Sequence, residues 1–228
     1  MFGGDRIFVG RFINKLRDLG FTQGFLFFAL GLRQRFTFGV SQMALWGATE
    51  VYEGSSDEYA IPLEKDIHSV FKTFRDSILI VSGETKSVSS RAGHGLMEGN
   101  PYASARYAQA NENIKNLLVA LKTGDLDTFI NITESEALQL HALMMCSNPS
   151  YILMKPNTLN LISEIRKFRE ETKIPLCFTL DAGPNVHLLY PEGETEKVED
   201  FIKDNLLSYC SDNKWIADCV GDGPKKLL

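Results

Sequence analysis

Two long amphipathic segments, separated by a single short break, constrain the fold of this chain more than any other feature. Residues 101–122 form the first segment and residues 125–146 the second, with Thr123 and Gly124 between them. Apolar residues recur in both segments at the spacing of one helix face, which predicts two amphipathic helices. Because only two residues separate the helices, the chain must reverse there, and we expect an antiparallel pair.

Short apolar runs on either side of this pair predict β-strands. Residues 77–81 form one run, and residues 176–180 and 186–190 form two more around an Asp-Ala-Gly-Pro-Asn sequence, which is typical of a hairpin turn. Further helices are expected at residues 87–98, 157–171 and 195–209. Strand, helices, hairpin and helix in this order predict an α+β fold in which helices cover one face of an antiparallel sheet.

Composition narrows the class of protein further. The chain has 228 residues, of which 44% are hydrophobic, and this is enough for one domain with a sizeable core. A net charge of −5 argues against a general nucleic-acid binder. The four cysteines form no CxxC pair, so we interpret them as reduced thiols of a cytoplasmic protein.

The net charge is unevenly distributed along the chain and changes sign near residue 43. Residues 1–43 carry six basic and two acidic side chains, a net of +4, so the remaining 185 residues carry −9. The same segment holds nine of the fifteen phenylalanines and no glutamate. A shift of this size marks a boundary, and we expect residues 1–43 to pack poorly against the rest.

We consider three interpretations of residues 1–43: a membrane-spanning or secretory segment, an amphipathic surface helix, and non-native sequence. The longest apolar run, residues 25–32, is far shorter than the roughly 20 residues that span a bilayer, and Arg17 and Asp18 argue against a secretory signal. A basic amphipathic surface helix fits the spacing of Phe8, Phe12 and Lys15, although several glycines weaken it. The third interpretation is non-native sequence, such as the product of a shifted reading frame.

Asp181 is the strongest candidate for a catalytic residue. It ends an apolar strand and enters a tight turn, so its backbone is held while its carboxylate can face a cleft. A carboxylate in that position, beside Gly183, can accept a proton from a substrate hydroxyl. The alternative is an aspartate that only bonds the amides of the turn.

A second candidate site lies at Ser90 and Arg91, in the run Ser-Val-Ser-Ser-Arg-Ala-Gly-His that begins at Ser87. Hydroxyls and an arginine at the start of a helix combine donors with the positive end of the helix dipole, which suits phosphate. The alternative is an ordinary serine cap with a solvated arginine. The four histidines lie far apart in the sequence, and we expect no metal site from them.

Several of these segments together resemble a known enzyme family. The segments are LWGATEVYEGSSDEYAIPL (45–63), SVSSRAGH (87–94), PYASARY (101–107), FTLDAGPNVHLLYP (178–191) and DCVGDGP (218–224). They resemble mevalonate diphosphate decarboxylase, a member of the small-molecule kinase superfamily that includes galactokinase, homoserine kinase and mevalonate kinase. The resemblance covers roughly residues 44–226 with every motif in the expected order, and the pairing of DAGPN with VSSR is its most specific part.

The resemblance implies an ATP-dependent and Mg²⁺-dependent decarboxylation of mevalonate 5-diphosphate to isopentenyl diphosphate, in isoprenoid synthesis. It assigns Asp181 to the family's catalytic aspartate, and Ser90 and Arg91 to its substrate-contacting pair. It implies a small-molecule substrate, with no nucleic-acid or membrane partner, and leaves a homodimer open.

The N-terminal motifs of the family cannot be recognised in this chain. Family members carry a phosphate loop for ATP and a substrate-binding turn at the N-terminal side, and neither is legible before Leu45. We therefore expect an atypical segment at residues 1–43, a remnant of an N-terminal domain with its linker at residues 44–75, and a C-terminal α+β domain at residues 76–228. The expected activity of the chain alone is impaired. The alternative hypotheses are another metabolite kinase, or an inactive fragment that acts as an anion-binding or interaction module.

Overall fold

A four-stranded antiparallel sheet forms the centre of the structure, a computed structural model that describes residues 43–45, 47–56, 61–63, 67–83, 99–181 and 183–220. Its strand order is β4-β5-β3-β6. The strands are β3 (Arg75–Leu79), β4 (Cys177–Leu180), β5 (Val186–Tyr190) and β6 (Trp215–Cys219). All three pairings are antiparallel, so the predicted α+β fold with an antiparallel sheet is confirmed.

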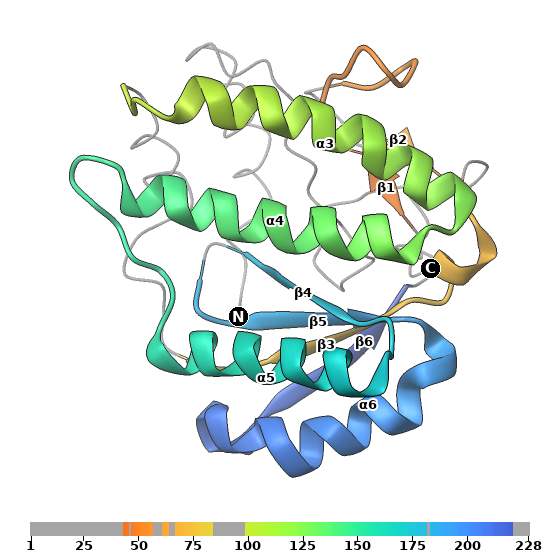
Figure 1. Ribbon diagram of the computed structural model, residues 1–228, viewed down its shortest axis with the longest axis vertical. Coiled ribbons are helices and arrows are strands. Elements are labelled where there is room, and N and C mark those ends of the chain that lie inside the picture. The colour runs from red at the N-terminus through yellow and green to blue at the C-terminus, as the bar shows by residue number, and fades with distance from the viewer. Residues whose placement is uncertain are drawn as a thin grey trace, which may run out of the picture.

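The two long helices form the predicted side-by-side pair (Figure 1). They are α3 (Ala103–Thr123) and α4 (Leu126–Met145), within two residues of the expected bounds. Gly124 ends α3 in the left-handed conformation with φ of 82°, and Asp125 caps α4 by accepting a hydrogen bond from the Thr128 amide. A Cβ at residue 124 would lie 2.8 Å from Nδ1 of His68, so glycine is required there both by conformation and by space.

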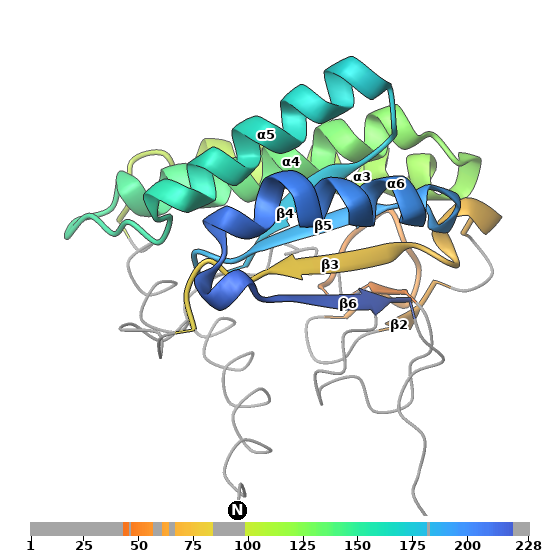
Figure 2. The same ribbon diagram turned by 90° about the horizontal axis from the view of Figure 1, so that it is seen from below.

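Two more helices cover one face of the sheet, which Figure 2 shows from below. They are α5 (Pro156–Thr172) and α6 (Thr195–Phe201). Alternate residues of the strands point toward them, and Phe178, Leu188 and Tyr190 lie in one buried cluster with residues of both helices. The period of two along each strand produces this division of the faces.

Strand positions on the opposite face belong to a second cluster, so helices pack against both faces of the sheet, and the expectation that they cover only one face was wrong. Cys177 and Leu189, which are directly paired across β4 and β5, pack with side chains of α3, α4 and the segment before β3. That segment contains two short paired strands, β1 (Ala44–Leu45) and β2 (Ile61–Pro62), and a 3₁₀ turn at Ser69–Phe71. Phe71, Phe74 and Phe129 form a tilted aromatic group with ring centroids 4.9–5.3 Å apart.

The structure differs from the sequence prediction in two places near the end of the chain. The helix expected at residues 195–209 is α helical only to Phe201 and continues as a π-helical segment, Ile202–Leu206, and a 3₁₀ turn, Leu207–Tyr209. Ile202 and Leu206 are both buried in this segment. Strand β6 was not predicted, and its Ile216 and Ala217 are exposed. The helix expected at residues 87–98 lies outside the described residues.

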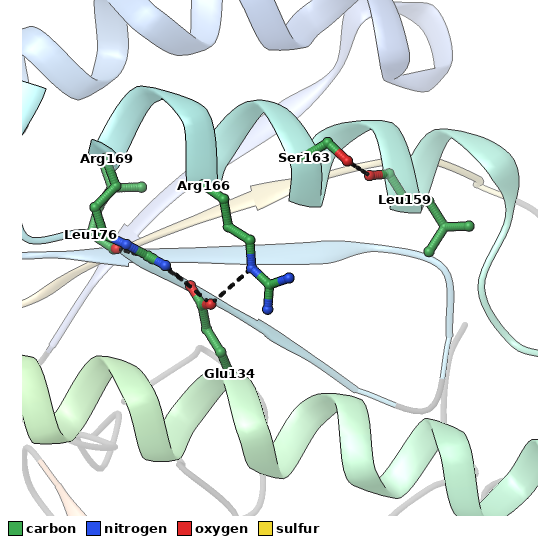
Figure 3. Close-up of polar contacts among 6 residues, drawn as sticks. All are labelled: Glu134, Leu159, Ser163, Arg166, Arg169 and Leu176. Carbon is green, nitrogen blue, oxygen red and sulfur yellow. Dashed lines mark hydrogen bonds and ion pairs between the residues drawn. The ribbon is translucent and has the colours of Figure 1, made fainter. Parts of the chain in front are cut away.

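A buried carboxylate joins α4 to α5 (Figure 3). The Glu134 side chain is 7% exposed and accepts hydrogen bonds from Nε of Arg166 at 3.3 Å and Nη2 of Arg169 at 3.2 Å. Arg169 also donates from Nη1 to the carbonyl of Leu176, one residue before β4. The cluster therefore fixes α5 relative to α4 and sets the point at which the chain enters β4.

Replacing Glu134 by glutamine should destabilise the protein strongly. The partly exposed guanidinium groups of Arg166 and Arg169 would lose their buried anionic partner, and we expect the free energy of unfolding to fall by about 2 kcal/mol, the scale of hydrogen bonds to charged groups. Glu112→Gln is the control, because its pair with Lys115 is exposed and should contribute less than about 0.5 kcal/mol. Urea unfolding of the three proteins measures this, and equal losses for the two variants would contradict a structural role for Glu134.

Candidate active site

Asp181 lies at the first position of the turn that joins β4 to β5, and its side chain is exposed. Its carbonyl oxygen accepts a hydrogen bond from the Gly183 amide at 2.7 Å. The strand before it is buried, with Phe178 and Leu180 in the core, so the carboxylate stands at the end of a fixed element. The predicted strand-end position of Asp181 is confirmed, whereas its catalytic role stays a prediction.

Three elements hold this turn from outside. Nε2 of His141, on α4, lies 3.1 Å from the carbonyl oxygen of Asp181. The Thr158 hydroxyl, on α5, donates to the Pro184 carbonyl at 2.7 Å, and the Ser82 amide after β3 donates to Oδ1 of Asn185 at 3.1 Å. The turn is therefore bonded at its beginning and at its end, which restricts its backbone although the Asp181 side chain is exposed.

His141 is almost fully buried, with 2% of its surface exposed. Because a carbonyl oxygen can only accept, the bond to Asp181 assigns the proton to Nε2. Burial lowers the pKa of His141 from its ordinary value of 6.5, and the bond to Asp181 with its nearby charge opposes part of that effect. His141 is thus a neutral donor near pH 7.

A second buried pair lies on the sheet beside this turn. Nδ1 of His187 is 3.0 Å from Oδ2 of Asp76, and the Asp76 side chain is 3% exposed. His187 is paired across β4 and β5 with Thr179, which precedes Asp181 by two residues. Asp76 is also the register partner of Asp218 on β6. Polar residues therefore occupy neighbouring positions on β5, β3 and β6.

Sequence reasoning missed His141, His187 and Asp76 as parts of the site. His141 could have been found, since it follows Ala137 by four residues and precedes Met144 by three, which places it on the buried stripe of α4. The pairing of Asp76 with His187 could not, because the two residues are 111 positions apart. Ser90 and Arg91 lie outside the described residues, so their role in contacting the substrate stays a prediction.

Two of the four cysteines, Cys177 and Cys210, are buried and poorly suited to nucleophilic chemistry. All four are free, and burial raises the pKa of the Cys177 thiol well above its ordinary value and that of Cys210 to about 11. A thiol held protonated in this way is a poor nucleophile. No group of three His, Cys, Asp or Glu side chains that could hold a metal occurs within the described ranges. No helix in the same part of the chain is long and apolar enough to cross a membrane.

The comparison that decides the family is a match of residues 77–226 to the model of the mevalonate 5-diphosphate decarboxylase C-terminal domain. The chain belongs to this family. The matched region contains the end of β3, the α3–α4 pair and the complete turn at Asp181, so the predicted resemblance is confirmed.

Individual relatives agree with this assignment. A phosphomevalonate decarboxylase of Haloferax volcanii is 29% identical over 100 residues, which cover 44% of this chain and 31% of that protein. A mevalonate diphosphate decarboxylase structure from Legionella pneumophila is 26% identical with a TM-score of 0.64, over 78% of this chain and 51% of that one. The decarboxylase MDDEF, in complex with MVAPP, AMPPCP and magnesium, has the same fold, with 23% identity, a TM-score of 0.64, and coverage of 79% and 53%. The curated relatives are matched over only 28–40% of their length.

Protonation of His141 should make stability depend on pH. Its pKa is lower in the folded state than in the unfolded chain, so the unfolded chain binds more protons between the two values. The free energy of unfolding should therefore be highest above pH 6.5 and fall as the pH drops toward the lowered pKa. His141→Gln should flatten this slope in urea unfolding measured between about pH 5 and pH 8. Parallel pH profiles of parent and variant would show that His141 is not the titrating group.

Proposed function

We propose that this chain supplies the catalytic aspartate of an ATP-dependent decarboxylase that converts mevalonate 5-diphosphate to isopentenyl diphosphate. The observation that carries the proposal is the family match of residues 77–226 around an exposed aspartate, Asp181, on a turn bonded to three elements. Rigid backbone with an accessible carboxylate is the arrangement that proton transfer from a bound substrate requires.

Asp181 binds the tertiary 3-hydroxyl of the substrate and accepts its proton. Ser90 and Arg91 hold the anionic groups of the substrate, since serine hydroxyls and an arginine are strong donors to phosphate and carboxylate oxygens. Neutral His141, which bonds the backbone of Asp181, adds no positive charge that would weaken the carboxylate as a proton acceptor.

ATP and Mg²⁺ belong to this proposal as requirements of the reaction rather than as ligands of the described residues. Those residues contain neither a glycine-rich phosphate loop nor a cluster of metal ligands, so they do not fit either group. We propose that an N-terminal domain holds both, that residues 44–75 are the end of that domain and its linker, and that residues 76–228 form the C-terminal domain. Without the ATP-binding half we expect impaired activity, in a cytoplasmic enzyme that can form a homodimer.

Asp181→Asn tests the catalytic assignment in a form of the enzyme that has an intact ATP-binding half. The parent should release carbon dioxide from mevalonate 5-diphosphate when ATP is added. The variant keeps the size of the side chain but loses the proton acceptor, so kcat should fall by about 10²-fold or more while KM changes little. Asp127→Asn, in the first turn of α4, is the matched control and should keep the parent rate.

Two outcomes would change the proposal. A rate for Asp181→Asn within a few-fold of the parent would mean that Asp181 only braces the turn, since asparagine also suits such turns. Faster turnover of mevalonate 5-phosphate than of the diphosphate would assign this chain the substrate named for the Haloferax relative.

Arg91→Ala tests the anion site without requiring turnover. Inorganic diphosphate should bind the 228-residue chain weakly, and the variant should lose roughly 1.5–3 kcal/mol of binding free energy, the scale of hydrogen bonds to charged groups. Lys197→Ala is the control, because Lys197 is an exposed cation on α6. Titration calorimetry measures the three affinities. Equal binding by parent and Arg91→Ala would remove Arg91 from the site and assign the diphosphate to other residues.

A further inference from the structure

We infer that His141 is the positioning residue of this site: by donating a hydrogen bond to the backbone of Asp181, it sets where the Asp181 carboxylate stands. The inference rests on the proposed role of Asp181. It adds a residue that lies in none of the five segments of the family resemblance. His141 does not touch the reacting atoms in this arrangement. It acts through the Asp181 peptide.

The contact constrains one peptide from two sides. His141 comes from α4, and its Nε2 lies 3.1 Å from the Asp181 carbonyl oxygen, which also accepts the Gly183 amide at 2.7 Å. One carbonyl oxygen thus carries two bonds, one from within the turn and one from a helix. A carbonyl has two lone pairs, so both bonds can form together, and they fix the orientation of this peptide.

Helix α4 is a firm base for such a contact. Its Ala137 is buried against the sheet, and Glu134 ties the same helix to α5 through Arg166 and Arg169. The imidazole is itself buried, so its rotation is restricted by packing. Movement of the Asp181 peptide is therefore limited by the whole helix layer rather than by the turn alone.

The carboxylate needs this constraint because its own side chain is exposed. The position of an exposed aspartate depends on its backbone and on two side-chain torsions, and an error of about 1 Å in a reacting group can cost about 10²-fold in rate. A neutral donor serves here better than lysine or arginine. A permanent positive charge so close to Asp181 would stabilise the carboxylate and weaken it as a proton acceptor.

The test compares His141→Leu, which removes the donor, with His141→Gln, whose side-chain amide can still donate. In the 228-residue chain, amide hydrogen exchange at Gly183 is measured relative to Leu188 in β5, so that a global loss of stability cancels. His141→Leu should raise this ratio about fivefold or more, and His141→Gln should keep it within about twofold of the parent. Leu143→Ala removes a buried side chain two residues further along α4 and should leave the ratio unchanged.

Kinetics of the form of the enzyme that has an intact ATP-binding half provide the second measurement. His141→Leu should lower kcat about tenfold with KM within about twofold, His141→Gln should recover most of kcat, and Leu143→Ala should resemble the parent. An unchanged exchange ratio in His141→Leu, or a kcat no lower than that of Leu143→Ala, would overturn the inference. If the parent releases no carbon dioxide, the proposed function fails, while the exchange ratio still decides whether His141 holds Asp181.

Discussion

The position of β3 between β5 and β6 is the constraint on which the rest of the structure depends. Its two partner strands lie more than a hundred residues further along the chain, as the Ser77–Tyr190 hydrogen bond across 113 positions illustrates. The helices and the hairpin therefore have to be in place for β3 to become a central strand. The polar pairs on β3 add specificity to this register: Asp76 meets His187 on one face, and Ser77 meets Tyr190 on the other. A shift of one residue would break both pairs.

The same arrangement explains which parts of the fold could be predicted. Helices α3, α4 and α5 and the β4–β5 hairpin are local, because their apolar periods, their caps and the turn lie within short windows of sequence. Strand β6 could not be predicted in this way, since Ile216 is 51% exposed and the strand exists only because β3 offers it an edge to pair with. The π-helical segment after α6 also depends on packing, as it is the core that requires both Ile202 and Leu206.

The same distinction between local signals and long-range contacts applies to the candidate site. The sequence was sufficient to place Asp181 at the end of a strand and at the start of a turn, because Gly183, Pro184 and Asn185 follow it closely. It was insufficient for the groups that hold the turn, since His141 is 40 positions and Ser82 is 103 positions from its partner. A histidine on the buried stripe of an amphipathic helix is a useful signal even so. Such a position requires a polar partner from another element, because an unpaired buried imidazole costs free energy.

The supports of the turn explain how the carboxylate can be exposed without being loosely placed. Binding a substrate group requires access from solvent, whereas accurate proton transfer requires a fixed position, and a single side chain rarely meets both demands. In the proposed role of Asp181, the two demands fall on different atoms of one residue. The Asp181 side chain has the access, and its carbonyl oxygen has the bonds from His141 and Gly183. Because those bonds are made to the backbone by a buried neutral donor and an amide of the turn, they do not compete with the substrate for the carboxylate oxygens.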